Sequence, residues 1–325
     1  MIDLHRHFEG SIRPATAVEM AQRNGDLPTD VPAANLTDHF LINPSGTREF
    51  GYFLAFFLKL RKLIRSAADV ERLVSEVLED AHAEGITHLD LRFSPQFLTA
   101  AGGGPVEELA TVFLNTADAC AGRLRMAVAY IVTLNRDYGL DGNRGSLTML
   151  ERPEFARRIA GVDVAGTEGQ YSIEPFRPFL EQALADGLFL TLHAGEAGGP
   201  ENVREAVEWG ATRIGHGIHV VQSPAVVEFA RSRGVVFEVC PQSNLLTGVV
   251  PDASHHPLAK MLAAGLNVTI NSDDPGLMGT TLRSEFAFCR HDLGIPDAQL
   301  QRCRDVALKT FLAHGLPVPA PKPAL

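Results

Sequence analysis

The feature that most restricts the fold of this chain is an eightfold alternation of short apolar runs with longer amphipathic stretches. Strands that alternate with helices form parallel sheets, and eight such units favour a closed barrel over an open sheet. The apolar runs are Ile2–His5, Ile86–Phe93, Met126–Leu134, Val162–Ala165, Leu188–His193, Arg213–His216, Val235–Val239 and Asn267–Asn271. The clearest amphipathic stretches are Ala67–Glu84, Glu107–Gly122, Ile173–Asp186, Asn202–Trp209, Pro224–Arg233 and Leu258–Ala264. The sequence therefore predicts an α/β fold, a (β/α)8 TIM barrel.

Glycines mark the boundaries between these units. Gly85, Gly187, Gly234 and Gly265 each lie between a helical stretch and the next apolar run, where a helix C-cap is expected. We therefore predict that residues 1–325 form one barrel.

The segment between the first and second predicted strands, residues 24–66, is unusually long. It holds a polar stretch, Asn24–Pro44, and then an apolar run, Phe50–Leu63. Insertions after a barrel strand lie on the catalytic face, so this one is predicted to be a helical cover over the pocket. The alternative is a set of extra helices packed on the barrel rim. The proline-rich tail, residues 316–325, is predicted to be extended and exposed.

The amino-acid composition limits the classes of partner that the protein is expected to bind. The net charge of −10 disfavours nucleic acid, because an acidic surface repels phosphates, and leaves a small molecule as the expected partner. No apolar run reaches the roughly 18 residues of a membrane span, and the N-terminus lacks the features of a signal peptide. The four cysteines have neither C-x-x-C spacing nor the density of a disulfide framework, which fits a reducing cytoplasm.

Four polar motifs follow predicted strands directly. Each is a weak signal alone, but the C-terminal ends of barrel strands converge on one face, where active sites of this fold lie. The motifs are H-R-H at His5–His7, H-A-G-E at His193–Glu196, G-H-G at Gly215–Gly217 and N-S-D-D-P at Asn271–Pro275. Their joint occurrence predicts a functional site on this face.

The motifs contain the donors of a metal site. His5 and His7 are two residues apart, so both point to one side of a strand. His193 adds a third imidazole and Asp273 a carboxylate, a set that suits one catalytic zinc ion with an open position. Such an ion lowers the pKa of a bound water to about 7. Iron and manganese remain alternatives for this donor set.

Two further residues could handle protons. Glu196 lies three residues after His193 and is placed to exchange a proton with a substrate, since a carboxyl in a closed pocket can have a raised pKa. The alternative is an acidic residue that merely precedes a helix. His216 could orient a water or contact the metal, because the flanking Gly215 and Gly217 indicate close backbone approach.

The combined motifs H-x-H-x-E-G, V-D-V-A-G-x-E, H-A-G-E, R-I-G-H-G, C-P-x-S-N and S-D-D-P resemble those of the adenosine deaminase family, from His5 through Glu285. The resemblance implies hydrolysis of adenosine or 2′-deoxyadenosine to the inosine form and ammonia. It implies that Glu196 protonates purine N1 and that His216 orients and deprotonates the attacking water. It also implies that Asp274 binds N7 and that the backbone N–H of Gly166 meets N3. The implied zinc ligands are His5, His7, His193 and Asp273.

Glu9 departs from the family pattern, which has Asp at a position near the ribose 5′ end. The change is either a conservative replacement or a sign of a different sugar or 5′ group. Some relatives deaminate adenine, and others a 5′-extended adenosine such as 6-aminodeoxyfutalosine of menaquinone biosynthesis, whose carboxylate would need an arginine. Arginines near predicted strand ends, each of which is more often a surface or framework residue, are Arg6, Arg13, Arg92 and Arg136. Aromatic side chains that could widen the pocket, or simply pack in the core, are Phe50, Phe53, Phe56 and Phe57.

The same residues bear on two other functions, a general metallohydrolase and a non-catalytic purine-binding protein. A mononuclear metallohydrolase of an ester or amide would share the metal set but would not need Asp274 or Gly166. A non-catalytic purine-binding protein would be expected to lack a ligand or Glu196. No lysine ends the fourth strand, as a two-metal site would require, and the H-x-E…P-C-x-x-C pattern of cytidine deaminases is absent.

Overall fold

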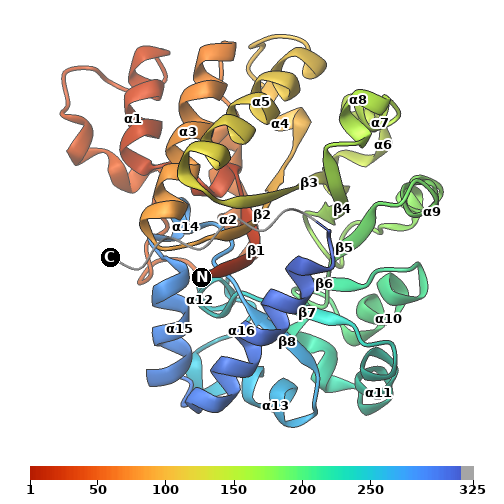
Figure 1. Cartoon of the computed structure of the whole chain (residues 1–325). Helices are drawn as coiled ribbons and strands as arrows, with labels where there is room; N and C mark the ends of the chain where they lie inside the picture. The colour runs from red at the N-terminus through yellow and green to blue at the C-terminus, as the bar shows by residue number, and fades with distance from the viewer. Residues whose placement is uncertain (316–325) are drawn as a thin grey trace.

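The strands of the computed structural model, which describes residues 1–315, form one parallel eight-stranded sheet in the order β1 to β8. At the seam, His7 N donates to Asp273 O at 2.9 Å and Asp273 N donates to His5 O at 2.8 Å. These bonds bring β1 against the end of β8, and the strands surround one axis (Figure 1). The predicted TIM barrel is confirmed. The strands are β1 (Ile2–His7), β2 (His88–Phe93), β3 (Ala127–Asn135), β4 (Ile159–Ala165), β5 (Phe189–Ala194), β6 (Arg213–His216), β7 (Val236–Val239) and β8 (Asn267–Ile270).

Amphipathic helices surround the strands and bury their apolar faces against them (Figure 1). Side-chain caps fix several starts: Ser66 accepts from Asp69 N, Ser223 from Val226 N, and Thr281 begins a capping box. The longer helices are α1 (Pro14–Arg23), α2 (Phe50–Leu60), α3 (Ala67–Ala83), α5 (Val106–Leu124), α9 (Arg177–Ala185), α10 (Pro200–Glu208), α11 (Pro224–Ser232), α15 (Leu282–His291) and α16 (Asp297–Leu312). The shorter ones are α4 (Pro95–Thr99), α6 (Gly139–Gly142), α7 (Arg144–Leu150), α8 (Pro153–Ala156), α12 (Pro241–Leu246), α13 (Leu258–Ala263) and α14 (Pro275–Met278).

The predicted boundaries differ from the observed ones in a few places. β1 continues to His7, and β4 begins at Ile159, three residues before the predicted Val162. The short helices between β3 and β4 were not predicted, because Gly139, Gly142 and Pro153 interrupt the helical pattern there. Helices α15 and α16 also lie beyond the units predicted from the sequence.

The long segment after β1 contains α1, three short 3-10 helices and α2. Helix α2 buries Phe53, Phe56 and Leu60 and turns other side chains toward a cavity that the strand ends also line. Residues 316–325, predicted to be an extended tail, lie outside the described residues. Within residues 1–315, no helix is both long enough and apolar enough to cross a membrane.

Candidate active site

The four polar motifs meet at the C-terminal ends of the strands. His5 and His7 come from β1, His193 from β5 and His216 from the end of β6, and all four are buried. The ring centroid of His5 lies 5.1 Å from that of His7, 4.7 Å from His193 and 4.9 Å from His216. Asp273, just after β8, completes the group through the seam of the barrel.

The donor atoms have the spacing that a small metal ion requires. His5 Nε2 lies 3.3 Å from His7 Nε2, and Asp273 Oδ1 lies 3.5 Å from the first and 3.6 Å from the second. Donors around a tetrahedral ion with bonds of about 2.0–2.1 Å stand about 3.3–3.4 Å apart. One ligand atom each from His5, His7 and His193 falls within 4.8 Å of the others. Burial lowers the pKa of His5 and of His7 well below the usual range, so both imidazoles are neutral, as ligation requires.

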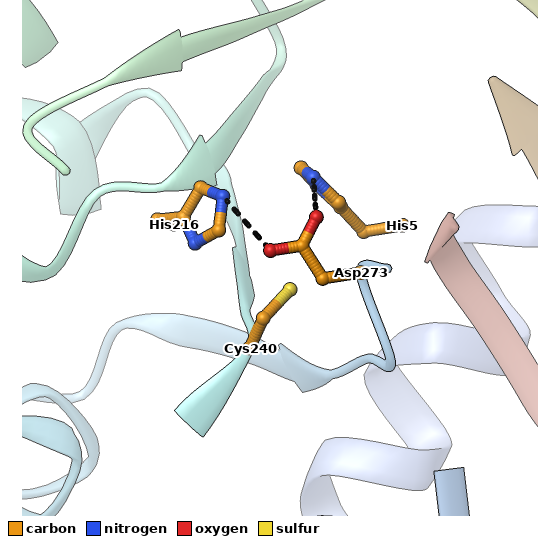
Figure 2. Close-up of side chains that lie close together, drawn as sticks. All are labelled: His5, His216, Cys240 and Asp273. Atoms are coloured by element: carbon orange, nitrogen blue, oxygen red, sulfur yellow. Dashed lines mark ion pairs between the residues drawn. The ribbon is translucent and has the colours of Figure 1, made fainter. Parts of the chain in front are cut away.

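Cys240 is a neighbour that the sequence did not single out. His5, His216, Cys240 and Asp273 form a second tight group, drawn in Figure 2. Burial raises the pKa of the Cys240 thiol well above its usual range, and its S–H points to Glu238 O at 3.7 Å. A protonated thiol is a poor ligand, so the oxygen of Asp273 is the better donor. Cys240 is the first residue of the C-P-x-S-N motif, but the motif gave no indication that its side chain lies beside His5, His216 and Asp273.

Two buried carboxylates orient the imidazoles of His5 and His193. Glu238 Oε2 on β7 accepts from His5 Nδ1 at 2.9 Å, and Asp163 Oδ2 on β4 accepts from His193 Nδ1 at 2.9 Å. Each hydrogen bond places the ring proton on Nδ1 and leaves the Nε2 lone pair free to bind a metal ion. Although burial opposes it, His193 and Arg92 hold the pKa of Asp163 far below its usual range. The sequence prediction contained neither role.

Beneath these carboxylates lies a buried ionic layer. Arg92 donates to Asp163 Oδ2 at 3.0 Å and also pairs with Glu238. Arg213 pairs with Glu238 as well and with Asp90 Oδ2 at 2.6 Å. Charges removed from water this completely need such partners, and the partners also fix the carboxylates in place.

Glu196 and His216 face each other beside the metal donors. His216 Nε2 lies 3.7 Å from Glu196 Oε2 and 3.7 Å from Asp273 Oδ2. Burial, Asp273 and Glu168 raise the pKa of Glu196 well above its usual range, which favours the protonated acid. His216 and Asp273 adopt left-handed φ angles of +56° and +62°, a strain that is typical of functional positions.

Close backbone approach at His216 was expected from its glycines. A Cβ on Gly215 would meet His5 Cε1 at 3.0 Å and His193 Cγ at 3.2 Å. A side chain at this position would therefore push the ligand rings apart. This explains why a glycine precedes His216.

These residues open into a cavity of about 320 Å³, which Glu9, Gly166 and Asp274 help to line. Glu9 accepts from Ser94 N at 2.6 Å, and burial raises its pKa to about 7. Gly166 has a φ of +107°, and a Cβ there would meet Asn135 Oδ1 at 2.8 Å. Asp274 Oδ1 is buried and has no hydrogen-bond partner among the described residues. Burial and Asp273 raise the pKa of Asp274 well above its usual range, so this carboxyl can carry a proton for a ligand acceptor.

None of the four arginines considered from the sequence lines the cavity, so the framework alternative holds for all of them. Arg6 donates to Ser272 Oγ at 2.9 Å, Arg13 to Asp80 at 2.7 Å, and Arg136 to His193 O at 2.7 Å. Together with Arg92 in the ionic layer, they are framework residues. A position near a strand end does not by itself show whether an arginine side chain points into the cavity or forms hydrogen bonds between neighbouring elements of the barrel.

Arg61, at the C-terminal end of α2, is the arginine that the sequence prediction missed. It is the only lysine or arginine among the cavity-lining residues of the described chain. Its Nη1 donates to Tyr138 OH at 2.8 Å, and its guanidinium lies 4.8 Å from the Tyr138 ring centroid. Of the four phenylalanines considered, Phe50, Phe53 and Phe57 line the cavity and Phe56 does not.

Comparison with known sequences places this arrangement among deaminases. The family model described as adenosine deaminase matches residues 1–314. A Serratia proteamaculans adenosine deaminase is 32% identical over 321 residues, which span 97% of this chain and 94% of the relative. An Edwardsiella ictaluri adenosine deaminase is 31% identical over 309 residues, or 94% and 91% of the two chains.

Solved structures agree with these sequences. An adenine deaminase from Arthrobacter aurescens is 26% identical, with a TM-score of 0.83 over 95% of this chain and 92% of that one. An amidohydrolase from Burkhoderia ambifaria with bound Zn is 25% identical, with a TM-score of 0.84 over 96% and 87% of the two chains.

Proposed function

The chain belongs to the adenosine deaminase family of hydrolytic deaminases, and we propose that it removes the C6 amino group of a 6-aminopurine nucleoside with one bound zinc ion. One observation carries the proposal: the buried Glu196 and His216 flank the donor cluster at the base of a cavity whose wall includes Asp274. A metal site alone fits many hydrolases, whereas an acid, a water-facing histidine and an unpartnered carboxyl together fit the edge of a purine.

We propose that His5, His7, His193 and Asp273 hold the zinc ion. Their donor spacing and the neutral imidazoles of His5 and His7 support this, as does the Zn in the Burkhoderia amidohydrolase. When bound, the ion supplies a water of lowered pKa and a fixed position for it.

Glu196 is the proposed proton donor. Its raised pKa favours the protonated carboxyl, which can donate to purine N1 and make C6 more electrophilic. The proposed anchors of the ring are Asp274 at N7 and the backbone N–H of Gly166 at N3, with Glu9 toward the sugar. After the water oxygen has bonded to C6, the amino nitrogen takes up the proton that the water released, the C6–N bond breaks and ammonia leaves. The remaining hydroxyl proton returns to the Glu196 carboxylate as the C6 carbonyl forms.

Hydrogen bonds determine which nitrogen of His216 carries its proton. Leu258 N donates to His256 Nδ1, so His256 Nε2–H donates to Asn244 Oδ1 at 3.4 Å. Asn244 Nδ2 then donates to His216 Nδ1 at 3.1 Å, which leaves the His216 proton on Nε2. We propose that this N–H orients the attacking water and that Asp273 Oδ2, 3.7 Å away, receives the proton of the water. This differs from the role implied by the resemblance, in which His216 also deprotonates the water.

A second candidate substrate is a 5′-extended adenosine with an anionic group, such as 6-aminodeoxyfutalosine. The observation that favours it is Arg61, a cation at the cavity wall without a carboxylate partner among the described residues. We propose that residues 24–66, which carry Arg61, cover the pocket. The four buried free thiols fit the reducing cytoplasm proposed as its location.

The test is a comparison of kcat/KM for adenosine, 2′-deoxyadenosine, 6-aminodeoxyfutalosine and adenine. Each reaction is monitored through the release of ammonia and the change in purine absorbance. We expect at least one nucleoside to be the best substrate. Turnover of adenine alone would reject the nucleoside assignment in favour of an adenine deaminase. Cleavage of esters or amides without any purine deamination would favour the general metallohydrolase instead.

A further inference from the structure

Glu168 ends the V-D-V-A-G-x-E motif, and the proposed chemistry leaves it without a role. Its buried carboxylate accepts five hydrogen bonds from the segment that follows β5. Oε1 accepts from Gly195 N at 2.5 Å and from Asn202 Nδ2 at 2.8 Å. Oε2 accepts from Glu196 N at 2.8 Å and from Ala197 N and Gly198 N at 3.0 Å each.

The segment 195–198 is a turn whose successive N–H groups point inward to one place. Turns of this kind bind anions, and here the anion is a side chain of the same chain. An ionised carboxylate accepts without donating, and its bonds to N–H groups are stronger than neutral ones. Because Glu196 is a member of the turn, its backbone position is set by Glu168.

The same residue connects two loops that face the cavity. Gly166, a cavity-lining residue, lies two positions before Glu168. Thr167, between them, donates to Asp137 from its N at 2.8 Å and from its Oγ1 at 3.0 Å. The loops after β3, β4 and β5 are therefore joined side by side, and the distance between Gly166 and Glu196 is fixed.

We propose that Glu168 is a positioning residue, which holds the loop of the proton donor Glu196 against the loop of Gly166. The inference rests on the proposed function only for the role of Glu196. Misplacement of a reacting group by about 1 Å can lower a rate about 10²-fold. Loss of the five-bond clamp is thus expected to lower kcat while substrate binding by the rest of the cavity persists.

The first test replaces Glu168 by Gln, which keeps the shape but turns an N–H₂ group toward N–H donors. We expect kcat to fall about 10²-fold, with KM changed less than about threefold and the zinc content unchanged. Hydrogen exchange measured by mass spectrometry should accelerate in the peptide that contains residues 195–198 and not elsewhere. Tyr130→Phe, which removes a half-buried hydrogen bond to Asp118 far from the site, controls for general destabilisation.

A second variant covers the case in which Glu168→Gln does not fold. In Gly198→Ala, the new Cβ would meet Glu168 Cδ at 2.8 Å and Asn202 Nδ2 at 2.3 Å, so it displaces the carboxylate from outside. The φ of Gly198 lies outside the left-handed region, which makes the backbone compatible with alanine. Gly122→Ala, whose Cβ meets nothing within 4 Å, is the matched control.

The outcomes separate the clamp from the proposed function. Unchanged exchange in 195–198, or unchanged kcat in a variant with faster exchange, would overturn the positioning role. A loss of kcat that equals the loss of zinc would also overturn it, since the effect would then be general damage. If Glu196→Gln kept full activity, the proposed function would fail, while the exchange experiment would still report on the clamp.

Discussion

The cavity has two walls that are built in opposite ways. On the barrel wall, three of the histidines are held by buried partners: Glu238 for His5, Asp163 for His193 and Asn244 for His216. The α2 wall is largely apolar and includes the rings of Phe50, Phe53 and Phe57. Its one charge is Arg61, whose side chain has the Tyr138 hydroxyl as its one hydrogen-bond partner in the described chain.

This difference separates two tasks. Groups that carry out a reaction must be held in place before the substrate arrives, because reorganisation during the reaction is costly. An apolar wall with a single charge instead selects by shape and by one ionic contact, and it can change without disturbing the chemistry. We therefore expect changes on the barrel wall to affect all substrates alike and changes on the α2 wall to affect substrates differently.

Removal of the metal is expected to have the largest effect. A chelator should abolish deamination of every substrate, and added zinc should restore it. The melting temperature should also fall, because an ion that binds only the folded protein stabilises it. Protein shown by elemental analysis to be free of metal, yet fully active, would contradict the proposed centre.

Glu196→Gln is expected to lower kcat by about 10²–10⁴-fold for all substrates. Burial, Asp273 and Glu168 raise the pKa of Glu196, which favours the protonated acid, and the proton is lost as pH rises through that raised pKa. The wild-type rate should accordingly decline on the alkaline side, and this decline should be missing from the residual activity of the variant. The same alkaline decline in both proteins would assign it to another group.

Asp163→Asn tests the barrel wall at a residue that contacts a proposed metal ligand without binding the metal itself. The amide keeps the shape of the side chain but removes the charge that faces His193 Nδ1 and Arg92. Loss of such an outer partner costs about 10–100-fold in metal affinity or activity. Zinc competition with a chromophoric chelator measures the affinity. Asp118→Asn, in the exposed pair with Arg158, should leave the affinity unchanged.

The two walls also differ in how far the sequence predicted them. Strand ends are marked by local features, namely an apolar run and the polar motif that follows it, so His5, His193 and Asp273 could be brought together from the sequence alone. The partners Glu238 and Asp163 lie inside the strands, and they meet the ligands only because the barrel closes.

Arg61 shows what local patterns cannot supply. It follows an apolar helix in a long insertion, and only tertiary packing turns it toward the site. The arginines beside the motifs were more conspicuous in the sequence, but none of them lines the cavity. Arg6, for example, lies between His5 and His7, so strand alternation turns it away from them, toward Ser272 and Glu84.

The smallest effect is expected for Arg61→Ala, and it should depend on the substrate. A charge-assisted hydrogen bond contributes about 1.5–3 kcal/mol, so loss of Arg61 should raise KM by about tenfold or more for an adenosine with an anionic 5′ extension. Adenosine itself has no such group, and its kcat/KM should change less than about threefold. The exposed neighbour Lys62 lies outside the cavity lining, so Lys62→Ala removes an equal charge as the matched control. An equal loss for both substrates would mean that Arg61 acts by holding α2 against Tyr138, and the α2 wall would then share the structural role of the barrel wall.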